Sequence, residues 1–425
     1  DPVTRGFLHR SGFSGGMSTA EGIALFFGEL DRPSRDRVTI HLGAAEKAML
    51  DDRFPGLRAA MADAADRPRP RVARVDPDLL PPAIGRRSLR ASDRTFDADD
   101  RAFDFLLDLD HDPYLAHHLV DGRPTLPGTF ALELAATAAE TLCPGRRAIA
   151  FEHVVFRKFL RPHPTRKSLA IRVRATRISD IADGTRTSEV MVTRTDVPVP
   201  SGELLVADQV HADLEVRVAD RPGCSTVPPR AVLATGWPTV DPYLQPNPAV
   251  QLSGPLDTLR SPVRGEHAGQ AMFVLRPEAY RAPFDRFRIP ALLLDGLART
   301  SVLAGGDRTA RPLVALSRIE RVDLFDSAAD GRNDGALAAT YPRIRLIAGP
   351  DPATPGAFLS EAVAPSGVVL ARISGLVGAL LGWCTADGAG FRRADRGRET
   401  RSVTTTVTQS SGLVRQSAAH AAPEE

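Results

Sequence analysis

The sequence predicts an α+β chain built from two similar units, each with one long apolar helix enclosed by an antiparallel sheet. Two apolar stretches of helical length, residues 129–142 and 291–303, support this prediction, and segments that alternate apolar and polar residues surround both. The first stretch is apolar on nearly every face, interrupted mainly by Glu133 and Glu140, which is typical of a buried helix. The two halves share this layout without a detectable repeat in sequence.

Bulk composition is that of an ordinary globular protein. The 425 residues are 43% hydrophobic, which is enough to bury a core in two or three domains. Lys and Arg total 54 against 52 for Asp and Glu, and this balance argues against a dedicated nucleic-acid or membrane-surface binder. No apolar run reaches the ~20 residues that span a bilayer. Cys143, Cys224 and Cys384 are too widely spaced for a disulfide framework or a metal site, which suits a reducing cytoplasm.

The first 45 residues predict the end of a larger α/β domain. Ser18 and Glu21 form a capping box ahead of an apolar helical face, and a strand follows at 38–42. One helix and one strand cannot make a core of their own. The chain begins with Asp1 and lacks a signal peptide, so we expect it to be a piece of a longer polypeptide.

Composition divides the remainder of the chain. Residues 46–95 include a stretch rich in Pro, Arg and Asp and predict a linker. Strand-like alternation around the two helices predicts domains at 96–235 and 236–388, separated by a Pro-rich stretch. Residues 389–425 contain few large apolar groups and predict a disordered tail.

One motif opens directly into the first helix. His118 is followed by three residues and Gly122, then by four residues and Pro127 with Gly128 next to it. A histidine just ahead of a helix faces backbone N–H groups that can polarise a substrate carbonyl. The glycine permits a tight turn, and the Pro-Gly pair brings the helix start close to a substrate.

This His118–Gly122–Pro127 motif resembles the active-site motif of polyketide synthase dehydratase domains, which have a double hotdog fold. The resemblance covers about residues 96–385, and 151–156 resemble the strand after the first central helix. Gly254 and Pro255 resemble a degraded form of the family's Gly-Pro-Phe segment. Pro290 to Asp295 resembles the second motif, in which an Asp begins the second central helix.

The N-terminal segment has a resemblance of its own. Residues 16–22 and the strand after them resemble the last helix and strand of a ketoreductase domain, without its dinucleotide-binding glycines or catalytic tyrosine. A ketoreductase followed by a dehydratase is a familiar order in multidomain synthases, of which the iterative enediyne and polyunsaturated-fatty-acid types are the relatives we expect.

The resemblance implies a β-hydroxyacyl-thioester dehydratase with His118 as base and Asp295 as acid. A neutral histidine is suited to removing the acidic α-proton, and the leucines around Asp295 supply the desolvation that favours a protonated carboxyl. It further implies an acyl carrier protein as partner, neighbouring synthase domains, a possible homodimer and a cytoplasmic location. No metal or organic cofactor is required beyond the carrier's phosphopantetheine.

One residue departs from the family pattern. Four positions after Asp295, where the family usually has Gln or His, this chain has Arg299 on the same helix face. A paired arginine would favour the ionised carboxyl and weaken it as an acid, whereas an arginine that points away could bind the phosphate of a carrier arm. Two alternatives to catalysis therefore remain open: a product-template-like domain that steers cyclisation, and an inactive spacer or carrier-docking domain.

Overall fold

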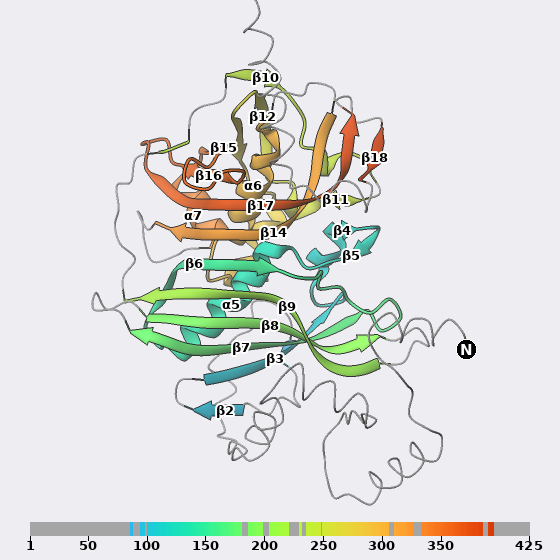
Figure 1. Ribbon diagram of the computed structural model, residues 1–425, viewed down its shortest axis with the longest axis vertical. Helices are drawn as coiled ribbons and strands as arrows, with labels where there is room; N and C mark the ends of the chain where they lie inside the picture. The colour runs from blue at the N-terminus through green and yellow to red at the C-terminus, as the bar shows by residue number, and fades with distance from the viewer. Residues whose placement is uncertain are drawn as a thin grey trace, which may run out of the picture. The chain divides into compact units, whose positions relative to one another are not determined.

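A computed structural model gives the arrangement of the two predicted units (Figure 1). The residues it describes are 86–87, 94–97, 100–180, 186–198, 204–220, 229–231, 235–247, 249–305, 310–325, 333–385 and 390–394. All of them fall within one compact unit, Pro70–Glu425. The ketoreductase-like segment predicted at 1–45 lies outside the described residues.

The first half wraps five long strands around helix α5 (Gly128–Leu142). In sheet order these strands are β3 (Asp100–Asp108), β7 (Ser168–Asp180), β8 (Arg186–Pro198), β9 (Leu204–Ala219) and β6 (Arg147–Phe156). The predicted alternation in β7 is confirmed, because Leu169, Ile171, Val173 and Ala175 are all buried. Short strands β1 (Arg86–Arg87) and β2 (Arg94–Asp97) pair with β3, so the sheet extends into the segment predicted as linker.

The second half repeats the plan around helix α6 (Ala291–Thr300). Its strands in sheet order are β14 (Ala310–Leu324), β17 (Val369–Thr385), β16 (Phe358–Val363), β15 (Ile344–Pro350), β13 (Gly269–Phe273), β12 (Leu259–Gly265) and β10 (Gly236–Pro238). A 3-10 turn, Ser301–Leu303, continues α6. Strand β18 (Phe391–Arg393) pairs with β17, so the sheet also runs into the predicted tail, where Phe391 packs against the core.

The two halves join edge to edge. Strands β6 and β14 pair antiparallel, with Val155 opposite Arg318 and Phe151 opposite Val322, and this merges both sheets into a single 15-stranded sheet. Helices α5 and α6 also contact one another. An aromatic cluster from both halves, Tyr114, Phe130, Phe284 and Phe287, has ring centroids 5.2–6.1 Å apart. The halves therefore share one hydrophobic core.

Two smaller elements position the site. Strands β4 (His118–Val120), β5 (Arg123–Pro124) and β11 (Val250–Leu252) form a separate three-stranded sheet in which Leu252 lies opposite His118. Helix α7 (Asp334–Thr340) lies beside the start of α6. None of the helices in the described ranges is long and apolar enough to cross a membrane.

Candidate active site

The His118 strand is set by a tight hairpin. Strands β4 and β5 are joined by Asp121 and Gly122, with φ values of 52° and 68°, as a two-residue type I′ hairpin requires. A Cβ on Gly122 would meet no heavy atom within 4 Å, so this position needs glycine for its backbone conformation and not for space. Gly122 thus shapes the loop and does not line the pocket described below.

The hydrogen bonds of His118 fix its tautomer. Its Nδ1 lies 2.8 Å from the carbonyl oxygen of Thr125, and the Thr125 amide donates to the His118 carbonyl at 3.0 Å. A carbonyl can only accept, so Nδ1 carries the hydrogen and Nε2 of the neutral ring has a free lone pair. Desolvation lowers the pKa of His118, with Asp295 opposing this and Arg299 adding to it. The ring is therefore a neutral base at pH 7.

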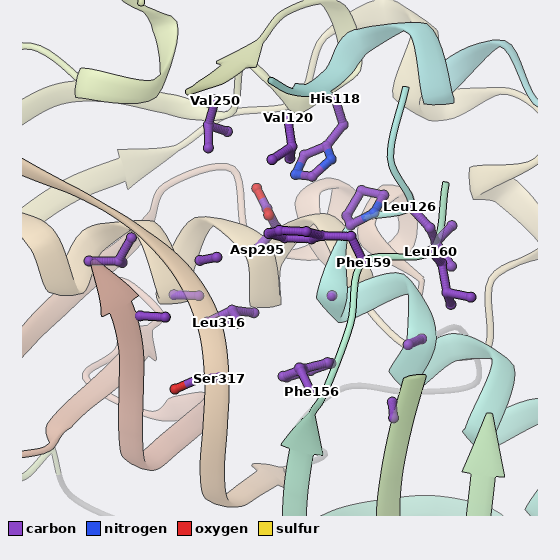
Figure 2. Close-up of a pocket in the computed structure, with 18 of the residues that line it drawn as sticks. His118, Val120, Leu126, Phe156, Phe159, Leu160, Val250, Asp295, Leu316 and Ser317 are labelled. Atoms are coloured by element: carbon purple, nitrogen blue, oxygen red, sulfur yellow. The ribbon is translucent and has the colours of Figure 1, made fainter. Parts of the chain in front are cut away.

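His118 and Asp295 meet at one pocket of about 280 Å³. Figure 2 shows the imidazole and the carboxyl group pointing toward one another, one from β4 and the other from α6. The helix begins at Ala291, so Asp295 lies one turn inside it and does not begin it as the family resemblance implied. The walls are mostly apolar; among the lining residues are Val120, Leu126, Phe156, Leu160, Val250, Leu252 and Leu316.

Arg299 lies next to Asp295 and makes several polar contacts. Its Nε donates to Asp295 Oδ2 at 2.8 Å, and its Nη2 donates to the Leu256 carbonyl at 2.8 Å and the Thr258 hydroxyl at 2.6 Å. Nη1 pairs with Asp241. The side chain is only 5% exposed and also lines the pocket, so of the two alternatives for Arg299 the structure has the arginine paired with Asp295.

A residue from outside α6 caps the helix that carries Asp295. Pro290 occupies the N-cap position and provides no side-chain acceptor. Instead, the buried carboxylate of Asp334 on α7 accepts from the amides of Leu292 and Leu293 at 2.9 and 2.8 Å. Burial raises the pKa of Asp334 to about 7, against the effect of those two amides. Sequence analysis missed both Asp241 and Asp334, because neither lies near a motif.

The start of α5 forms another part of the pocket. Pro127 and Gly128 both line it, and a Cβ on Gly128 would come within 3.1 Å of Leu316 and 3.3 Å of Phe156. Since the first amides of a helix have no intrahelical acceptor, this helix start presents donors beside His118.

Gly254 and Pro255 lie behind the histidine loop and not among the residues that line the pocket. Gly254 has φ +52°, and a Cβ there would come within 2.7 Å of His117 Nδ1. His117 also bonds Ser253, through Nδ1 to Oγ at 2.9 Å. This segment supports the His118 strand from behind. In the described part of the chain no three His, Cys, Asp or Glu side chains are grouped to hold a metal ion.

Comparisons with known proteins bear on the family and the fold of the chain. Residues 89–192 match the model of a family described as polyketide synthase dehydratase domain. No curated protein sequence matches the chain. Among solved structures, the dehydratase domain from the CurF module of curacin polyketide synthase has a TM-score of 0.50 and 15% identity, covering 70% of this chain and 99% of that one.

Two further solved structures are similar at lower scores. They are the dehydratase domain from the CurK module of the same synthase (17% identity, 72% of this chain, 99% of that chain, TM-score 0.46) and the erythromycin dehydratase (20%, 65%, 90%, 0.44). The predicted double hotdog fold is confirmed.

Proposed function

We propose that this chain, of which residues 89–192 match the polyketide synthase dehydratase family, removes water from a β-hydroxyacyl thioester to give the α,β-unsaturated thioester. The observation that carries the proposal is the pair formed by His118 and Asp295, which come from different halves of the fold and point toward one another across an apolar pocket (Figure 2). Pairs of titratable groups in contrasting environments are typical of acid–base catalysis.

His118 acts as the base. Its Nε2 lone pair takes the proton from the carbon next to the thioester carbonyl, while Nδ1–H stays bonded to the Thr125 carbonyl. That bond orients the ring and stabilises the imidazolium formed in the step. The amides at the start of α5, where Gly128 lines the pocket, stabilise negative charge on the thioester oxygen.

Asp295 acts as the acid. As the α-carbon–hydrogen bond breaks, its electron pair forms the double bond and the β-carbon–oxygen bond breaks. The Asp295 proton goes to the departing hydroxyl, which leaves as water. The cycle closes when the proton on His118 returns to Asp295 through solvent. No metal or organic cofactor takes part, and the substrate arrives on the phosphopantetheine arm of an acyl carrier protein.

The test is mass-spectrometric turnover of β-hydroxyacyl carrier-protein thioesters of several chain lengths. We expect a mass loss of one water with the wild type, a decrease of about 10²–10⁴-fold in His118→Ala and in Asp295→Asn, and an unchanged rate in His111→Ala. His111 is exposed and lies outside the pocket, so it is the matched control. Failure to dehydrate any of the substrates by a folded wild type would contradict the proposal.

The competing function is a domain of this fold without dehydratase activity, either product-template-like or a scaffold for carrier docking. The ion pair between Arg299 and Asp295 favours it, because a guanidinium stabilises an ionised carboxylate that has no proton to give. The same turnover experiment separates the two functions.

A further inference from the structure

The guanidinium of Arg299 has a second carboxyl partner. Asp241 immediately precedes the 3-10 turn η3 (Pro242–Leu244) in the segment between the halves. Its side chain is 2% exposed, pairs with Arg299 Nη1, and accepts from the Tyr243 amide at 3.0 Å. Tyr243 in turn bonds the Val314 carbonyl at 2.9 Å, which ties η3 to β14. Asp241 does not line the pocket, so it acts on the reaction indirectly, with Arg299 as its charged neighbour.

We propose that Asp241 is a positioning residue that neutralises Arg299 and so leaves the catalytic proton on Asp295. The inference rests on the proposed dehydratase function, and it explains how an acid can work beside an arginine.

Charge balance in the buried cluster is the first argument. The ionised Asp241 and Arg299 together are neutral, and His118 is neutral when it acts as base. An ionised Asp295 would then add an uncompensated negative charge in a buried place, which is costly, whereas a protonated Asp295 keeps the cluster neutral. Without Asp241 the ionised form of Asp295 would be favoured, because Arg299 would then need Asp295 as its counter-charge.

Hydrogen bonding decides which carboxyl keeps the proton. Asp241 accepts two donors, the Tyr243 amide and Arg299, whereas Asp295 accepts only from Arg299 Nε, through Oδ2. In the described chain no group donates to Asp295 Oδ1. Donors stabilise the charged form, so Asp241, with two donors, is the carboxyl that hydrogen bonding favours in its ionised form. Burial and the neighbouring Asp295 raise the pKa of Asp241, and the guanidinium of Arg299 and the Tyr243 amide oppose this rise.

The groups that act electrostatically on Asp295 come from five elements or loops. They are His118 at the start of β4, Arg299 on α6, Asp241 before η3, Tyr243 in η3 and Asp334 on α7. Arg299 is the only cation among them when His118 is neutral. Its neutralisation by Asp241 is therefore what allows Asp295 to hold a proton.

The direct test follows the Asp295 carboxyl by NMR in the full chain labelled with ¹³C at aspartate Cγ, its signal assigned by loss in Asp295→Asn. In Asp241→Asn we expect its titration to move to lower pH by about 1–2 units. In the double variant Asp241→Asn/Arg299→Gln, which removes both charges, we expect it at or above the wild-type pH. Asp110→Asn, an exposed aspartate, is the control and leaves it unmoved.

Kinetics give a second readout. In Asp241→Asn we expect the high-pH limb of kcat/KM for dehydration to move to lower pH together with the NMR titration, and in the double variant to return to its wild-type position. A merely structural role for Asp241 would instead lower the rate equally at every pH. An Asp295 titration that is the same in Asp241→Asn and the wild type overturns the inference. If Asp241→Asn does not fold, an Asp295 titration in the double variant below that of the wild type overturns it equally.

The NMR result separates this inference from the proposed function. Shifts as expected in a protein that dehydrates no substrate support the charge arrangement and contradict the dehydratase. Dehydration with an unmoved Asp295 signal supports the dehydratase and overturns the role of Asp241.

Discussion

The two central helices occupy equivalent places in their sheets and contribute in different ways. Helix α5 carries no proposed catalytic side chain; it brings Gly128 and the start of the helix to the pocket, and the proposed base comes from the strand before it. Helix α6 carries both Asp295 and Arg299 on its buried face. The first half therefore places His118 on a short hairpin. The second half places Asp295 on a helix that is held by segments distant in the sequence.

The buried carboxylates show the same contrast. Glu133 of α5 reaches across to the other half and accepts from the amides of Arg288 and Ile289 at 2.9 and 3.0 Å, just before α6 begins. Asp334 then caps α6 itself. The position of Asp295 thus depends on carboxyl groups from two other helices, whereas the His118 ring is oriented by Thr125, seven residues away. We expect substitutions outside the motifs to affect the acid more than the base.

Glu133→Ala gives the largest expected loss of stability. It leaves buried amides of Arg288 and Ile289 without an acceptor and opens a cavity, so we expect the free energy of unfolding to fall by about 3 kcal/mol or more. Urea denaturation measures the loss, with the exposed Glu278→Ala as control. A decrease no larger than that of the control would contradict this cross-connection.

The pH dependence of the free energy of unfolding gives a second test of the buried Glu133 carboxyl. Burial raises the pKa of Glu133 to about 8, so the folded state binds its proton more tightly than the unfolded state does. Its stabilising contribution is complete below the unfolded pKa near 4.5 and is lost as pH rises through about 8. Denaturation at pH 5 and pH 8 should therefore show a smaller decrease for Glu133→Gln than for the wild type. Equal decreases would show that Glu133 does not carry this proton.

Asp334→Ala is expected to have an intermediate effect. The loss of both acceptors at the start of α6 should lower the free energy of unfolding by about 1–2 kcal/mol and also reduce kcat, because Asp295 moves with the helix. Asn333→Ala is the matched control, since Asn333 caps α7 through the Ala336 amide and donates to the Asp285 carbonyl, and neither bond involves α6. If kcat falls equally in both variants, the cap on α6 has no special role in placing the acid.

Gly122→Ala is expected to have the smallest effect. An alanine must adopt φ near 68° in the hairpin, which should cost about 1 kcal/mol, and Gly122→Asn should cost less because asparagine tolerates that conformation. Gly145→Ala, at φ 82° and equally open, is a control outside the site. Thermal unfolding and kcat are measured for both Gly122→Ala and Gly145→Ala. Both variants should lose stability, but only Gly122→Ala should alter kcat.

The difference between the halves also explains what could be predicted from sequence. His118, Gly122 and Pro127 lie within ten residues, and local turn chemistry and helix patterning were enough to find them. The alternation of Leu169, Ile171, Val173 and Ala175 predicted a buried strand face for the same reason. Asp241 and Asp334 become part of the site only through contacts across 58 and 41–42 residues. An Asp before Pro242 indicates a turn cap at most, and nothing local indicates its bond to Arg299. The sheet also continues beyond both boundaries predicted from sequence. At the C-terminal end Phe391 packs against the core, which the polar residues around it in the sequence do not indicate.

The most direct test of the central claim is whether His118 and Asp295 act as one unit from two halves. Single-turnover dehydration of a carrier-bound β-hydroxyacyl thioester would be measured for the wild type, His118→Ala, Asp295→Asn and the double variant. We predict that the double variant loses no more rate than the poorer single variant, because groups that act in one step are not additive. Losses that multiply in the double variant, or a single variant that retains the wild-type rate, would contradict the account.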